Sequence, residues 1–255
     1  MDSTLIIDRG NSRLKLGWYR DGQRRRVWQG PLEAWEAVVA AWLRDEAPLT
    51  ALSVGWLSVA QPDWQPEALP LWQQVGLATQ WHQIDHRWPF PLINRYATPE
   101  TLGADRLVGV VAAKAHCPQQ PVLVIDAGTA LTYDLATADG QYLGGGIAPG
   151  LQMRLDALHH FTARLPQVAL PPDEAVPLIG DSTANSIRVG CYQGILAEIE
   201  GLARRYRDCL RSDLQVFLTG GDLSRFENRL ACVNFADPHL LLDGVHHLLT
   251  HRSSA

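Results

Sequence analysis

The chain has 255 residues, and its 22 Lys and Arg against 27 Asp and Glu give a formal net charge of −5. This balance argues against a nucleic-acid-binding surface. A content of 46% hydrophobic and 19% charged residues excludes a disordered chain. No segment approaches the roughly 18 apolar residues of a membrane span, and the start lacks the features of a signal peptide. We therefore expect a cytoplasmic protein without nucleic-acid or membrane partners, folded as one large domain or two lobes.

The first 84 residues predict strands and helices in a mixed order. Residues 4–8 form an apolar run that ends in Asp8, and a tight turn follows at 10–12. Apolar and polar residues alternate over 13–18, and Asp21-Gly22 is a strong hairpin signal before a third strand at 26–28. Helical spacing over 31–44 predicts a helix. A strand near 51–54, a helix near 66–75 and a strand near 79–84 complete the first part.

The same pattern restarts 118 residues later, after a second apolar run at 122–125. A constant offset at strand ends and hairpin turns indicates an internal duplication. We therefore predict an N-terminal lobe over 1–117 and a C-terminal lobe over 118–255. The residues that recur are Asp8, Gly10, Asp21, Gly22 and Gln23, which return as Asp126, Gly128, Asp139, Gly140 and Gln141.

The rest of the second part predicts helices near 150–162 and 183–208, a strand at 214–218, a helix near 222–231, a strand at 232–236 and a helix near 239–249. The segment 166–177 is the expected mobile loop. Between the two copies, Thr98-Pro99 resembles a helix entry, and apolar residues continue a helical face through Ala115.

The two repeated turns are candidates for phosphate binding. Glycines allow backbone N–H groups to approach an anion closely, and carboxylates beside them, Asp8 and Asp126, can hold a hydrated Mg²⁺. The alternative is that each aspartate only caps a hairpin turn. A third turn, Thr219-Gly220-Gly221-Asp222, ends a strand and opens a helix, which suits packing of a base or ribose against bare backbone.

An acid and a base lie together at the start of the helix that follows Thr98-Pro99. Asp105 can accept a proton from a hydroxyl group, and Arg106 can bind an anionic group of a substrate. The alternative is an ordinary charge pair on a solvated face.

Five motifs stand out along the chain: Asp8-x-Gly10-Asn11-Ser12-x-x-Lys15, Asn94-x-Tyr96, Leu102-Gly103-Ala104-Asp105-Arg106, Asp126-Ala127-Gly128-Thr129-Ala130 and Gly144-Gly145-Gly146-Ile147-x-Pro149-Gly150. In combination, they closely resemble the type III pantothenate kinases from residue 4 to about residue 222. The resemblance implies an α/β fold that is duplicated and two-lobed, the actin-like fold of acetate and sugar kinases with ribonuclease H-like halves and ATP in the interlobe cleft.

The resemblance also implies a function, the ATP-dependent phosphorylation of pantothenate in coenzyme A biosynthesis by a homodimer. Asp105 would be the general base, and Asp126 would ligate a monovalent cation, K⁺ or NH₄⁺, that acts alongside Mg²⁺. Pantothenate would contact Tyr96, Gly103, Ala104, Asp105, Arg106 and Thr183. ATP would contact Asp8, Arg9, Gly10, Asn11, Ser12, Arg13, Leu14, Lys15 and Thr129.

Two residues depart from the family pattern. Arg9 replaces an apolar or small residue, and it could lean out to solvent or alter the affinity for nucleotide; Arg95 replaces a proline. Lys15 could reach a phosphate or remain solvated. The rival functions are phosphorylation of another small hydroxylated substrate and a non-catalytic regulatory role, because a fold does not determine a function.

Overall fold

The structure is a computed structural model that describes residues 3–11, 13–46, 48–58, 61, 63–75, 77–170 and 176–251. Ser12 of the predicted phosphate turn and residues 171–175 of the predicted loop lie outside the described residues. The chain divides into two compact units. The first takes the described residues of Met1–Pro91, Tyr96–Ala115 and His239–Ala255, and the second takes Leu92–Arg95 and His116–Pro238.

The first unit contains a five-stranded sheet in the order β3-β2-β1-β4-β5. β1 pairs antiparallel with β2, and β2 with β3, whereas β4 and β5 run parallel to β1. The hairpin predicted at Asp21-Gly22 is confirmed, because both residues have positive φ, 52° and 74°, as the favoured two-residue turns require. The strands are β1 (Ser3–Arg9), β2 (Leu14–Arg20), β3 (Gln23–Gly30), β4 (Ala51–Ser58) and β5 (Ala78–Gln83).

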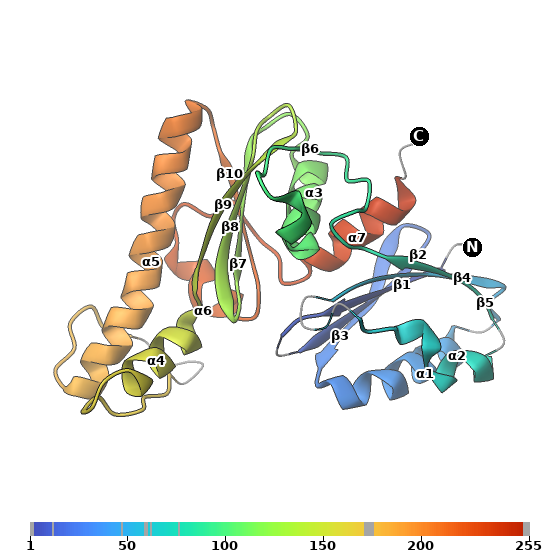
Figure 1. The fold of residues 1–255 in the computed structure, drawn as a ribbon, viewed down its shortest axis with the longest axis horizontal. Helices are drawn as coiled ribbons and strands as arrows, with labels where there is room; N and C mark the ends of the chain where they lie inside the picture. Colours follow the sequence, from blue (N-terminus) through green and yellow to red (C-terminus); the bar gives the residue numbers. More distant parts are fainter. Residues whose placement is uncertain are drawn as a thin grey trace. The chain divides into compact units, whose positions relative to one another are not determined.

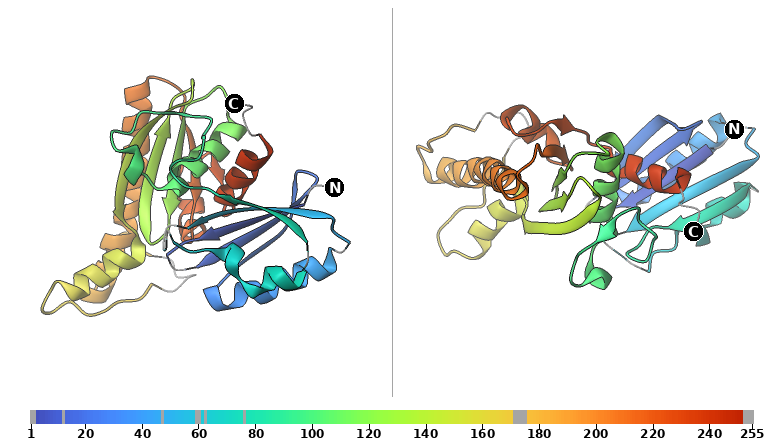
Figure 2. Two further views of the ribbon diagram at one scale, coloured as in Figure 1. Left: turned by 45° about the vertical axis from the view of Figure 1, so that its right-hand side comes forward. Right: turned by 90° about the horizontal axis from the view of Figure 1, so that it is seen from above.

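One face of this sheet packs against α1 (Trp35–Asp45) through a core rich in tryptophan, which includes Trp18, Trp35 and Trp42. Figure 2 shows α1 and the short α2 (Pro70–Val75) beside the sheet. α1 and α2 confirm the helices predicted at 31–44 and 66–75, each with a 3₁₀ turn before it, Leu32–Ala34 and Pro66–Ala68.

The C-terminal helix α7 (Leu240–Thr250) returns to this sheet and contacts β1, β2 and β4. Tyr19 of β2 donates a hydrogen bond of 2.5 Å to Asp243, and Arg24 donates one of 2.7 Å to the same carboxylate. The unit also holds the 3₁₀ turn Pro99–Thr101 and most of α3 (Ala104–His116). None of the described helices is long and apolar enough to cross a membrane.

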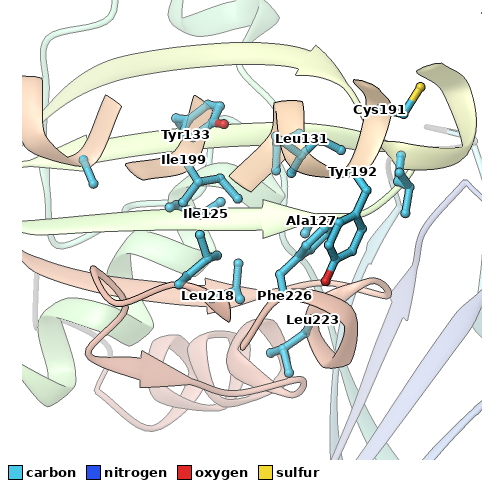
Figure 3. Packing of buried hydrophobic residues seen from close by; sticks show 14 of the residues in the cluster. Ile125, Ala127, Leu131, Tyr133, Cys191, Tyr192, Ile199, Leu218, Leu223 and Phe226 are labelled. Carbon is cyan, nitrogen blue, oxygen red and sulfur yellow. The ribbon is translucent and has the colours of Figure 1, made fainter. Parts of the chain in front are cut away.

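The second unit contains a six-stranded sheet in the order β11-β10-β7-β8-β9-β6. The long helix α5 (Thr183–Leu210) covers one face of it (Figure 1), and the core between them includes Ile125, Leu218 and Ile199 (Figure 3). The strands are β6 (Ile93–Asn94), β7 (Val122–Ala127), β8 (Ala130–Ala136), β9 (Gln141–Pro149), β10 (Gln215–Thr219) and β11 (Phe235–Ala236). The remaining helices are α4 (Leu151–His160), α6 (Leu223–Phe226) and the 3₁₀ turn Glu227–Arg229.

The topology of the two sheets confirms the internal duplication. β7, β8 and β9 form an antiparallel meander like β1, β2 and β3, while β10 and β11 run parallel to β7 as β4 and β5 do to β1. β6 adds one strand to the edge of the second copy. The helix predicted at 222–231 is only α6 and a 3₁₀ turn, and the strand predicted at 232–236 is only β11.

Candidate active site

Three charged side chains come together at the end of β1 in the first unit. Asp8 pairs with Lys15 across the β1–β2 ladder, and it is only 6% exposed. Burial raises the pKa of Asp8 from 3.8 to about 6, while the positive charge of Lys15 lowers this pKa and the negative charge of Asp105 raises it. Lys15 is half-buried and close enough to Asp8 to affect its pKa, and whether Lys15 reaches a phosphate stays a prediction.

The predicted turn joins β1 to β2. The N–H of Gly10 donates a hydrogen bond of 3.0 Å to the carbonyl of Arg13, which closes the turn. Asn11 and Arg13 are exposed, and Leu14 is buried at the start of β2. Apart from Ser12, which is not among the described residues, the turn therefore presents polar groups to solvent, as a phosphate site requires.

Arg9 lies over an indole ring. Its guanidinium carbon is 5.0 Å from the centre of the Trp64 ring, and Trp64 in turn packs edge-on against Trp35 and Trp56. Successive residues of a strand face opposite sides of the sheet. The side chains of Asp8 and Arg9 therefore lie on opposite faces. Arg9 is therefore held by a cation–π contact on the tryptophan-rich face.

The Gly103–Arg106 segment brings the general-base candidate to the first turn of α3. A carboxylate is favoured there by the helix dipole, and Asp105 lies close enough to Gly103 that a Cβ on Gly103 would overlap its Oδ1. Arg106 is buried, with its guanidinium carbon 5.7 Å from the centre of the Tyr96 ring. The alternative of a charge pair on a solvated face is therefore wrong for Arg106.

A cavity of about 640 Å³ adjoins this segment within the first unit. It opens at the carboxyl ends of β4 and β5, where open α/β sheets place their ligands, and its size suits a small molecule. No local pattern in the sequence indicates its acidic lining, because these residues come from three separate segments, 63–67, 85–87 and 100–104. The charged lining residues are Asp63, Glu67, Asp85, His86, Arg87 and Glu100, and Gly103 and Ala104 form part of the wall.

In the second unit, the carboxylate of Asp126 lies between two glycine turns. If Gly128 and Gly220 each carried a Cβ atom, these atoms would lie 3.4 Å and 2.5 Å from Oδ1 of Asp126, so both glycines are close to the carboxylate. The turn after β10 is tied to the end of β7, because the N–H of Asp222 donates a hydrogen bond of 2.8 Å to the carbonyl of Ala127. The structure thus brings Asp126 together with the Thr219–Asp222 turn, as well as with its own Gly128–Thr129 turn.

A network of hydrogen bonds holds the backbone of Thr129, whose side chain is exposed. The N–H of Gly150 donates to the carbonyl of Thr129 at 3.1 Å. The guanidinium of Arg154 donates to the carbonyl of Pro149 at 2.8 Å and to Glu198 of α5 at 2.6 Å. Glu198 also accepts from the hydroxyl of Tyr133 at 2.9 Å. Arg154 and Glu198 therefore anchor the start of α4 beside the second turn.

Two further predicted positions lie elsewhere in the second unit. Thr183 is the exposed first residue of α5, where Ser182 caps the helix by accepting a hydrogen bond of 3.3 Å from the N–H of Asn185. The N–H of Arg95 donates to the carbonyl of Tyr142 at 2.9 Å, a bond that a proline at this position could not form. The role of Thr183 toward a substrate stays a prediction.

The acidic residues suit Mg²⁺ bound together with a nucleotide. Among the described residues, no group of three or more His, Cys, Asp or Glu side chains is arranged to hold a metal ion. Mg²⁺ is usually held by one or two carboxylates together with substrate phosphates and water, and needs no such group. The buried Asp8 is a single carboxylate of this kind.

The buried Asp8 predicts a measurable pH dependence of stability. Because its folded pKa, about 6, exceeds 3.8, the folded state binds the proton more tightly. The contribution of Asp8 to stability is therefore greatest below pH 3.8 and is lost as pH rises through 6. Asp8→Asn removes the cost of burying a charged carboxylate and should raise the free energy of unfolding by about 1–3 kcal/mol above pH 7. Near pH 4, where Asp8 is protonated in the folded state, we expect little change. Urea unfolding of both proteins across this pH range measures the effect; an Asp8→Asn variant less stable above pH 7 would contradict it.

Solved structures show the fold. A protein from Sinorhizobium meliloti assigned as a 2-dehydro-3-deoxygalactonokinase aligns over 98% of this chain and 100% of its own, with a TM-score of 0.56 at 12% identity. A protein from Listeria monocytogenes assigned as an N-acetylmannosamine kinase aligns over 98% and 100%, with a TM-score of 0.50 at 13% identity. The two-lobed fold of these kinases, which the sequence predicted, is confirmed.

Sequence comparison shows the family. A profile of the type III pantothenate kinases matches residues 4–205. The type III pantothenate kinase of Phocaeicola vulgatus is 39% identical over 254 residues, which cover 97% of this chain and 98% of the relative. The enzyme of that name from Christiangramia forsetii is 47% identical over 167 residues, 66% of this chain and 68% of the relative. This chain therefore belongs to the type III pantothenate kinase family.

Proposed function

We propose that this protein transfers the γ-phosphoryl group of ATP to the primary hydroxyl of pantothenate, giving 4′-phosphopantothenate in the first step of coenzyme A biosynthesis. The observation that carries the proposal is the family match over residues 4–205. The relatives named type III pantothenate kinase extend this match over nearly the whole chain. Asp8, Lys15 and Asp105, which the family pattern includes, lie together in the first unit.

The two glycine turns are proposed to bind the phosphates of ATP. The first turn, over residues 8–15, offers backbone N–H groups, and the ammonium group of Lys15 lies beside Asp8. Thr129 of the second turn is exposed, and its backbone is held by Gly150. When bound, Mg²⁺ would neutralise charge on the phosphates, with Asp8 as the candidate carboxylate.

Asp105 is proposed to accept the proton of the attacking hydroxyl, and Arg106 to bind the carboxylate of pantothenate. Burial of Arg106 against Tyr96 favours this role, since a guanidinium removed from water binds an anion more strongly. Phosphoryl transfer passes through a loose transition state, so positioning contributes more than the strength of the base. Gly103, Ala104 and Thr183 would complete the acceptor site.

Three finer assignments belong to the same proposal. Asp126 would bind K⁺ or NH₄⁺, and the protein would act as a homodimer in the cytoplasm. Apolar side chains are exposed on β9, on α4 and just after it, and in the segment before α5, and pairing with a second copy would remove them from water. Phe161 is 81% and Ile179 82% exposed, and Ile147 and Met153 are exposed as well.

A coupled ADP-release assay tests the reaction. The protein is given ATP and Mg²⁺, with and without pantothenate, first in K⁺ buffer and then in Na⁺ buffer, after sedimentation velocity has measured its oligomeric state. We expect turnover that requires pantothenate and is faster in K⁺. Glucose and N-acetylmannosamine serve as control acceptors, since the structural neighbours include proteins assigned as sugar kinases. Turnover with a sugar alone, or no turnover from folded protein, would contradict the proposal.

A further inference from the structure

A buried hydroxyl without a partner lies at the end of β10. Thr219 is 1% exposed, and within the part of the chain that the structure describes its Oγ1 has no hydrogen-bond partner. An unpaired buried hydroxyl destabilises a fold, and a valine of the same shape would avoid this cost. A buried hydroxyl without a hydrogen bond is therefore a candidate ligand group, because binding a ligand would offset its unfavourable free energy.

The neighbour of Thr219 on the adjacent parallel strand is Asp126. Residues in register on paired strands point to the same face of a sheet. Ile125, Ala127 and Leu218 turn toward α5 (Figure 3), so Asp126 and Thr219 turn to the opposite face. If Gly220 carried a Cβ, that atom would lie 2.5 Å from Oδ1 of Asp126, which places the carboxylate at the end of β10. The hydroxyl and the carboxylate therefore share one corner of the sheet.

A second threonine flanks Asp126 on the other side but lacks this feature. Thr132 of β8 is in register with Asp126 across the antiparallel ladder. Its hydroxyl donates to Asp134 at 3.3 Å, so it already has an acceptor. The two threonines are neighbours of the same carboxylate, and they differ in whether their hydroxyl groups are satisfied.

We propose that Oγ1 of Thr219 is a second oxygen ligand, beside the carboxylate of Asp126, for the monovalent cation. The inference rests on the proposed function, which assigns the cation to Asp126. A hydroxyl oxygen has two lone pairs and can face a cation while its hydrogen is donated to a carboxylate. Protein oxygens replace the hydration shell of K⁺ in this way. Gly220 has no side chain, so its backbone can lie directly against the carboxylate of Asp126 at this corner.

Three variants test the inference. Thr219→Val removes the hydroxyl and keeps the shape, Thr219→Ser retains a hydroxyl, and Thr132→Val is the matched control. The readouts are the shift in Tm caused by K⁺ relative to Na⁺, and the K⁺ concentration that gives half-maximal turnover. We expect Thr219→Val to match or exceed the wild type in Tm without K⁺, and to lose K⁺ affinity by about 10–100-fold. Thr219→Ser and Thr132→Val should keep the wild-type response.

The outcomes separate this inference from the assignments on which it rests. A wild-type K⁺ response in Thr219→Val, with that response lost in Asp126→Ala, would overturn the role of Thr219 and leave Asp126 as the cation ligand. A wild-type protein that phosphorylates pantothenate without any K⁺ response would overturn both cation assignments and leave the kinase proposal standing. Equal losses in Thr219→Val and Thr132→Val would also overturn the inference, because the effect would not depend on the unpaired hydroxyl.

Discussion

Asp105→Asn is expected to lower kcat by about 10²–10⁴-fold, the usual contribution of a general base. Asparagine has the size of aspartate and fits the first turn of α3, but it cannot take up the proton of an attacking hydroxyl. Asp105 lies near enough to Asp8 for its charge to raise the pKa of that residue. The substitution therefore removes one negative charge from a site that must receive the phosphates of ATP, so nucleotide affinity should be kept or improved.

The loss in kcat must be separated from damage to the fold. Steady-state kcat, Tm and ADP affinity are measured for Asp105→Asn and for Asp45→Asn. Asp45 ends α1 in the same unit, and it is 59% exposed in a surface ion pair with Arg26 at 2.8 Å. Exposed pairs contribute at most about 1 kcal/mol, so Asp45→Asn should keep wild-type kcat. Near-normal kcat in Asp105→Asn would remove Asp105 from the role of base.

The sequence predicts those parts of the fold that depend on local pattern and on repetition. The recurrence of Asp8 and Gly10 as Asp126 and Gly128 anticipated two sheets of the same topology, because equivalent strand ends and turns impose equivalent pairings. The positive φ of Asp21 and Gly22 follows from the hairpin signal in the same way. The helix predicted at 222–231 is shorter than its pattern implied, since its buried Leu223 and Phe226 pack into the core of the second unit within one turn.

Features that depend on distant contacts could not be predicted. The return of α7 to the first sheet is stabilised by Tyr19 and Asp243, which lie 224 residues apart in the chain. The acidic cavity and the contacts of Arg154 with Glu198 likewise join separate segments. The lack of a hydrogen-bond partner for the hydroxyl of Thr219 could not be predicted either, because no local sequence pattern shows which buried hydroxyl has no acceptor.

Gly220→Ala is expected to destabilise the protein strongly, whereas Gly221→Ala, its neighbour and matched control, should have little effect. Gly220 has a φ of 105°, and a Cβ there would lie 2.5 Å from the carbonyl carbon of Ala127 and equally close to Oδ1 of Asp126. Backbone strain of this kind costs about 1–3 kcal/mol, and overpacking against a rigid backbone costs about 1–3 kcal/mol more. A Cβ on Gly221 would meet nothing within 4 Å.

Urea unfolding of the two variants measures the difference, which should reach about 2–6 kcal/mol in the free energy of unfolding. This is a large share of the stability of a typical domain, about 5–15 kcal/mol. The added Cβ of Gly220→Ala would also displace the carboxylate of Asp126, so any folded fraction should respond weakly to K⁺. Equal stability of the two variants would show that the end of β10 can move away from Ala127 and Asp126. In that event the sheet would not hold Thr219 and Asp126 in a fixed arrangement, which would count against Thr219 as a cation ligand.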